Sequence, residues 1–178
     1  SILNKQLLHE GITVSMEEAI RLNASAVAFS IMVGAEYERD TLLAFTQVVD
    51  QAERYGIPTL AVTAVGKEMV RDAKFLGLAS RLAAELGARI VKTYFCEGFE
   101  KVVQSCPVPI VIAGGKKIPE KDALQMAYDA VRTGAAGVDM GRNIFQADAP
   151  VAMVQAVRAI VQEDATAAAA FELYNDLK

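Results

Sequence analysis

The chain has 178 residues, of which 53% are hydrophobic, and this suits about one domain with a large core. Its net charge of -4, without long basic tracts, argues against nucleic acid as a partner. No apolar run approaches the roughly 20 residues that a bilayer-spanning helix needs, so we expect no membrane segment. Two cysteines do not form a disulfide framework, which favours a reducing cytoplasm, and a single histidine argues against a His-rich metal cluster.

Short apolar runs alternate with amphipathic stretches along the whole chain. In chain order we expect a helix at 16–20, a strand at 26–31, a helix at 38–55, a strand at 59–63, a helix at 69–86, a strand at 88–92, a helix at 99–104, a strand at 110–112, a helix at 119–133, a strand at 137–140, and helices at 150–162 and 164–178. Strands that alternate with helices predict an α/β fold with a parallel sheet covered by helices.

The number of units bears on the architecture. A complete (β/α)8 TIM barrel typically needs about 250 residues. Five strand–helix units in 178 residues therefore predict the later part of a barrel, with residues 1–178 forming a single domain. An open doubly wound sheet is the alternative.

Lys92 is the first candidate for chemistry, because it ends the predicted strand at 88–92. The carboxyl ends of parallel strands are where α/β folds keep their ligands. Only a neutral amine attacks a carbonyl, and desolvation in a barrel favours that form. Strand alternation places Tyr94 on the same side as Lys92, and Thr93 on the opposite side. The competing interpretation is a surface lysine beyond a shorter strand.

Two later strand ends carry glycines and a cation, namely Gly114 with Gly115 and Gly141 with Arg142. Phosphate binding needs backbone N–H groups that can approach closely, which favours glycine, and Arg142 can add a charge-assisted fork. Ordinary turn chemistry is the alternative for these glycines. A lysine nucleophile beside two such loops predicts Schiff-base chemistry on a phosphorylated carbonyl compound.

Other candidates are less constrained. Lys67 follows the strand at 59–63 and is a candidate acid/base or second cation, or else an exposed loop lysine. Lys116 and Lys117 can add point charges near the glycine loop. Cys96 is more readily a small packed residue than an acyl carrier. The side on which Asp139 faces is left open.

Three stretches carry a resemblance: IVKTY at 90–94, IAGGKK at 112–117 and VDMGRNIFQ at 138–146. The chain resembles the class I aldolase family that includes deoxyribose-phosphate aldolase and the archaeal-type fructose-bisphosphate aldolases. This resemblance implies a (β/α)8 barrel of which the chain holds strands 4–8 and the C-terminal helices. It also implies that Lys92 forms the Schiff base and that Gly114, Gly115, Gly141 and Arg142 hold a phosphate.

Within the family the chain is most similar to the thiolase branch of autoinducer-2 breakdown. That likeness implies transfer of acetyl from a phosphorylated hydroxy-diketone to coenzyme A, leaving dihydroxyacetone phosphate. It implies no metal, no cofactor other than coenzyme A as co-substrate, and a homo-oligomer such as a decamer. The stretch at 63–66 lacks the tyrosine that fructose-bisphosphate aldolases of this type carry, and no counterpart to the family's first three strands is found. The alternatives are a phosphosugar aldolase and a non-catalytic phosphosugar-binding protein.

Overall fold

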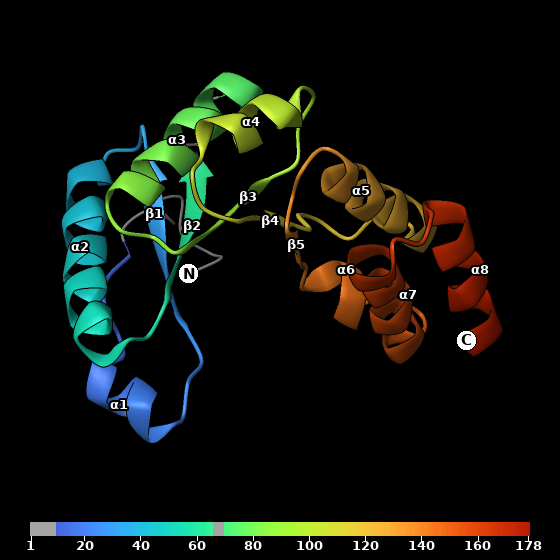
Figure 1. Ribbon diagram of the computed structural model, residues 1–178, viewed down its shortest axis with the longest axis horizontal. Coiled ribbons are helices and arrows are strands. Elements are labelled where there is room, and N and C mark those ends of the chain that lie inside the picture. Colours follow the sequence, from blue (N-terminus) through green and yellow to red (C-terminus); the bar gives the residue numbers. More distant parts are fainter. Residues whose placement is uncertain (1–9, 66–69) are drawn as a thin grey trace.

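The computed structural model describes residues 10–65 and 70–178, which form a five-stranded sheet with helices around it (Figure 1). The strands are β1 (Val27–Val33), β2 (Thr59–Val65), β3 (Ile90–Tyr94), β4 (Ile110–Ala113) and β5 (Gly137–Asp139). The helices are α1 (Met16–Arg21), α2 (Glu38–Tyr55), α3 (Ala73–Glu85), α4 (Phe99–Ser105), α5 (Glu120–Arg132), α6 (Arg142–Phe145), α7 (Pro150–Glu163) and α8 (Ala167–Leu177). Each predicted strand and helix has a counterpart, and α6 is an additional single turn.

The order of the strands decides between the two predicted architectures. All neighbouring strands are parallel, and their order in the sheet is β1-β2-β3-β4-β5, the order of the sequence. A doubly wound sheet reverses its strand order at a switch point, whereas a barrel does not. In Figure 1 the helices α2, α3, α4 and α5 form an arc around the strands. The described chain therefore consists of five consecutive units of a (β/α) barrel.

The two faces of the sheet differ in burial, as strand β3 illustrates. Val91 and Thr93 are fully buried, whereas Ile90, Lys92 and Tyr94 are partly exposed. Helix α3 contacts this strand, so the buried face is the one that the helices cover. The predicted alternation of Lys92 and Tyr94 against Thr93 is confirmed, and Lys92 and Tyr94 belong to the inner face.

Several element boundaries differ from the predictions. Strand β3 continues through Tyr94, so Lys92 lies in the middle of the strand and not at its end. The helix predicted at 69–86 begins only at Ala73, because the Asp72 carboxylate accepts the backbone N–H of Phe75 at 2.9 Å and caps it. Helix α2 ends as predicted, at Gly56 in the left-handed conformation with φ 68°.

Two groups of buried side chains stabilise the fold. The first, which we call the sheet cluster, includes Phe45 and Phe99 and fills the space between the sheet and α2, α3 and α4. The second, the C-terminal cluster, includes Leu124 and Met153 and lies among α5, α7 and α8. Val138 and Met140 on either side of Asp139 pack against both clusters, so strand β5 is held from two directions.

No helix in residues 10–65 and 70–178 combines the length and the apolar character that a membrane crossing requires.

Candidate active site

A pocket of about 290 Å³ lies at the carboxyl ends of β3, β4 and β5. Its volume is just below the ~300–1,000 Å³ that is typical of small-molecule sites. It is lined by Val62, Thr63, Lys92, Tyr94, Ala113, Gly114, Gly115, Asp139, Gly141, Arg142 and Phe145. The structure thus brings together five of the predicted site residues, from three separate strand ends. The sixth, Lys67, lies outside the described residues.

The Lys92 amine pairs with a carboxylate across the sheet, since Nζ lies 3.1 Å from Oδ2 of Asp139. Asp139 is in register with Ala113, which in turn is in register with Tyr94. Partners in register point to the same face, so Asp139 faces the inner side of the sheet with Lys92. Alanine at position 113 leaves room for the amine to reach across β4.

This ion pair contributes little to stability. The Lys92 side chain is 22% exposed and that of Asp139 is 48% exposed. Ion pairs that solvent screens to this degree are worth about 0–1 kcal/mol. The position of the Lys92–Asp139 pair in the pocket therefore favours a chemical role for it over a stabilising one.

The glycine loop that follows β4 is clamped by one buried side chain. The Asn143 amide, with none of its surface exposed, donates to the Gly114 carbonyl at 2.6 Å and to the Lys116 carbonyl at 3.2 Å. Its Oδ1 accepts the Ile118 N–H at 2.9 Å. A Cβ on Gly114 would lie 2.9 Å from Met140 Cγ, so only glycine fits there. Gly115 has φ 65°, the left-handed region that glycine adopts without strain.

The two lysines of the loop do not line the pocket. Lys116 is exposed, and Lys117 donates to the Ile118 carbonyl and to Oε1 of Glu120, both at 2.7 Å. The Lys117 ammonium holds the pKa of the Glu120 carboxyl below its ordinary value. Among the residues described, Lys92 and Arg142 are the cations that line the pocket.

Aromatic and hydroxyl contacts position β3. The Arg71 guanidinium stacks over the Tyr94 ring, with its carbon 3.9 Å from the ring centroid. Thr63 Oγ1 donates to the Lys92 carbonyl at 3.2 Å from the neighbouring strand β2. These contacts fix the backbone on which Lys92 sits and place the Tyr94 ring as one wall of the pocket.

Both cysteines are free thiols. Burial, followed by the charges of Asp72 and Glu100, raises the pKa of the Cys96 thiol, and burial raises the pKa of Cys106. Cys96 is half-buried and lines a separate open groove with Lys74 and Lys101, not the Lys92 pocket. A thiol that stays protonated is a poor nucleophile, so these features favour a packing role.

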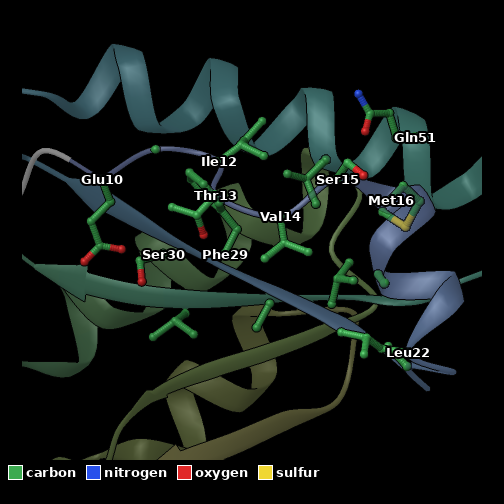
Figure 2. Close-up of a pocket in the computed structure, with 17 residues that line it drawn as sticks. Glu10, Ile12, Thr13, Val14, Ser15, Met16, Leu22, Phe29, Ser30 and Gln51 are labelled. Carbon is green, nitrogen blue, oxygen red and sulfur yellow. The ribbon is translucent and has the colours of Figure 1, made fainter.

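A second pocket, of about 440 Å³, lies beside the first and shares Val62 with it. Figure 2 shows residues 10–16 lying between helix α2, which carries Gln51, and strand β1, which carries Phe29 and Ser30. Its lining is mostly apolar, and Glu10 is its one ionisable residue among those described. It offers no cation for a phosphate, which sets it apart from the Lys92 pocket.

Comparison with known proteins agrees with this geometry. The family model described as "DeoC/LacD family aldolase" matches residues 3–147. The chain belongs to the DeoC/LacD aldolase family. The match includes β1 to β5 and every predicted site residue.

Several curated relatives of this chain carry the same name. A protein of Yersinia pestis (strain Pestoides F) called "3-hydroxy-5-phosphonooxypentane-2,4-dione thiolase" is 57% identical over 169 residues, which is 94% of this chain. A protein of the same name from Yersinia pseudotuberculosis serotype O:1b shows the same identity and coverage. The chain spans 58% of the length of these relatives.

Solved structures show the same fold. An archaeal fructose 1,6-bisphosphate aldolase superposes with a TM-score of 0.78 at 27% identity, covering 87% of this chain and 67% of that one. Another structure of an archaeal fructose-1,6-bisphosphate aldolase, with a TM-score of 0.77 at 27% identity, has its catalytic lysine covalently bound to the carbinolamine intermediate of the substrate.

Two residues of the pocket region were not assigned from the sequence. Asp139 is the last residue of β5, but the three residues of this strand are too few to show an alternation that would place its side chain. Asn143 stands directly after Gly141 and Arg142, and its position in a four-residue helix gave no pattern that indicates burial.

Proposed function

We propose that this aldolase-family chain carries the active site of an enzyme that cleaves a carbon–carbon bond in a phosphorylated ketone through a Schiff base. The observation that supports this most directly is the shared pocket, into which Lys92 projects beside Gly114, Gly115, Gly141 and Arg142. An amine nucleophile and a phosphate cradle in one pocket fit a substrate that carries a carbonyl and a phosphate a few atoms apart.

Each residue has a distinct role in this proposal. The Lys92 amine attacks the ketone carbon and, after loss of water, forms an iminium that draws electrons from the neighbouring carbon–carbon bond. The backbone N–H groups of Gly114, Gly115 and Gly141 contact the phosphate oxygens, and the Arg142 guanidinium neutralises their charge. Lys67 stays our candidate for a second catalytic lysine.

We propose that the substrate is the one that the relatives' name describes, a phosphorylated hydroxypentanedione. In a thiolase reaction the acetyl group passes to a thiol, and coenzyme A is the acceptor that we propose, with dihydroxyacetone phosphate as the other product. The 57% identity to relatives of that name supports this choice. We propose no metal and no bound cofactor besides this co-substrate.

A fructose-bisphosphate aldolase is the second candidate, because solved structures of that activity share the fold at 27% identity. The two reactions share the iminium and differ in the bond that breaks and in the need for an acceptor thiol. Measuring coenzyme A-dependent acetyl release against cleavage of fructose bisphosphate distinguishes them. Acetyl-coenzyme A formation without fructose bisphosphate cleavage is the expected result.

The proposal is tested by trapping the iminium with borohydride. The full chain is incubated with dihydroxyacetone phosphate, reduced, and mapped by mass spectrometry. We expect a stable adduct on Lys92, which Lys92→Ala abolishes and Lys121→Ala, at an exposed lysine of α5, leaves intact. A folded protein that binds phosphate and yields no adduct would instead support the non-catalytic phosphosugar-binding alternative.

We further propose a single domain that assembles as a homo-oligomer, up to a decamer, in the cytoplasm. The contacts of Val138 and Met140 with both buried clusters support one domain. The exposed apolar side chains of Val151 and Val154 on α7 support an oligomer, and two free cysteines suit a reducing compartment. Sedimentation at several protein concentrations tests the assembly.

A further inference from the structure

The Lys92 pocket contains one acidic group among the residues described, the carboxylate of Asp139. Its Oδ2 lies 3.1 Å from Lys92 Nζ, within reach of a direct proton transfer. The other polar and charged groups of the pocket are the Tyr94 phenol from β3, with Arg71 stacked on its ring, the Thr63 hydroxyl from β2, and Arg142 from α6. Asp139 is thus the group best placed to take a proton from the lysine.

We propose that Asp139 is the proton-transfer residue for formation of the iminium at Lys92, an inference that rests on the proposed function. Two features support it beyond the distance. Asp139 is in register with Ala113, whose small side chain leaves the path between the two groups open. Strand β5 is also packed against both buried clusters through Val138 and Met140, which holds the carboxylate at a fixed position.

The proton balance of the step is complete with these two residues. Asp139 takes one proton from the Lys92 ammonium, and the freed amine attacks the ketone carbon, forming the C–N bond. A second proton passes from nitrogen to the former carbonyl oxygen and gives the carbinolamine. Asp139 then returns its proton to that hydroxyl, the C–O bond breaks, water leaves, and the nitrogen lone pair forms the iminium. The carboxylate ends as it began, and one water is the by-product.

The step needs a group that can both take up and return a proton, which a carboxylate at position 139 can do and a second permanently charged cation could not. It must be negative while the lysine holds its proton, and it must carry that proton until it passes it to the departing hydroxyl. Because Asp139 is half-exposed at the pocket mouth, water released by the dehydration has a route to solvent. A base on the buried, helix-covered face of the sheet, where Thr93 lies, could not reach the substrate carbon.

The test compares Asp139→Asn and Asp139→Ala with Asp164→Asn, a matched change at an exposed aspartate paired with Arg132 at 3.4 Å. The rate at which a borohydride-trappable adduct with dihydroxyacetone phosphate forms is measured over a range of pH values. Binding of inorganic phosphate is measured separately. We expect Asp139→Asn to slow trapping by about 100-fold or more, as loss of a general acid–base does. Phosphate binding stays within about twofold, and Asp164→Asn behaves like the unsubstituted protein.

Chemical rescue separates proton transfer from mere positioning of the lysine. Formate is expected to restore adduct formation in Asp139→Ala, in proportion to its concentration, and to leave the unsubstituted protein unaffected. Unchanged trapping in Asp139→Asn at every pH would overturn the role of Asp139 while leaving the Schiff base intact. Loss of trapping without rescue would also overturn it, in favour of a purely structural role. No adduct in the unsubstituted protein would instead overturn the proposed function itself.

Discussion

The side-chain amide of Asn143 donates to the carbonyl oxygen of Gly114 at 2.6 Å, across 29 positions of sequence. This bond joins α6 to the loop after β4, the two segments that we propose hold the phosphate. The same side chain also bonds to the Lys116 carbonyl and the Ile118 N–H. One buried amide therefore sets the distance between both halves of the cradle.

Replacing Asn143 by aspartate should loosen this cradle. The carboxylate keeps an acceptor for Ile118 but loses both donated bonds and faces two carbonyl oxygens. We expect a loss of about 1–3 kcal/mol in the free energy of unfolding, and at least tenfold weaker binding of inorganic phosphate. Urea denaturation and calorimetry measure the two quantities. Asn175→Asp, at an exposed position of α8, is the control, and equal behaviour of both variants would contradict the clamp.

The two loop glycines should respond differently to alanine. In Gly114→Ala the new Cβ meets Met140 Cγ at 2.9 Å and Asn143 Nδ2 at 3.0 Å, so the clamp has to shift. In Gly115→Ala no atom lies within 4 Å, and the cost is the left-handed backbone alone, about 1–2 kcal/mol. We expect both to lose stability, and only Gly114→Ala to displace Asn143. Crystal structures of the two variants check this, and an unmoved Asn143 in Gly114→Ala would refute it.

Cys96 should react slowly with alkylating agents. Its raised pKa, caused first by burial and then by Asp72 and Glu100, keeps the thiol protonated near neutral pH. In a Cys106→Ser background we expect iodoacetamide to modify Cys96 more slowly than it modifies N-acetylcysteine. Cys96→Ser should retain acetyl transfer. Recovery of an acetyl thioester on Cys96 during turnover would contradict the packing role.

Stability should fall in acid partly through Glu120. Its pKa is lowered from the ordinary 4.5, mainly by the hydrogen bond from Lys117. A carboxyl with a depressed folded pKa contributes stability above its unfolded pKa and loses it as pH falls through the folded value. We expect Glu120→Gln to cost about 1 kcal/mol near neutral pH and to show a shallower acid decline. Denaturation midpoints measured from neutral pH down to below the ordinary carboxyl pKa test this, with Glu85→Gln as the control at an exposed ion pair.

The order of the elements was predictable because most of the strands are short apolar runs that stand between glycine or proline and stretches of helical periodicity. Strand β4 at Ile110–Ala113, bracketed by Pro109 and Gly114, shows this well. The start of α3 was misplaced because residues 69–72 have helix-compatible side chains, and only the cap made by Asp72 fixes the boundary. Whether a given aspartate caps a helix in this way is visible only in the structure.

The candidate site was predictable to the extent that strand ends converge in a parallel sheet. The glycines and Arg142 followed from that rule, since each stands just beyond a strand, and Lys92 lies within β3 two residues before its end. The partner of Lys92 did not, because pairing between Lys92 and Asp139 depends on the register of three strands and on the small size of Ala113. Register is a tertiary property that a single sequence does not encode in any short window.

Strand β5 has only three residues, yet Val138 within it and Met140 directly after it contact both the sheet cluster and the C-terminal cluster. Substitutions that repack either cluster, for example at Phe99 or Leu124, therefore also shift the backbone that carries Asp139. Variants selected for heat resistance can change their turnover even when no substituted residue is near the pocket. The reverse also holds: a library of core substitutions in the C-terminal helices offers a way to tune the lysine's partner without touching either member of the pair.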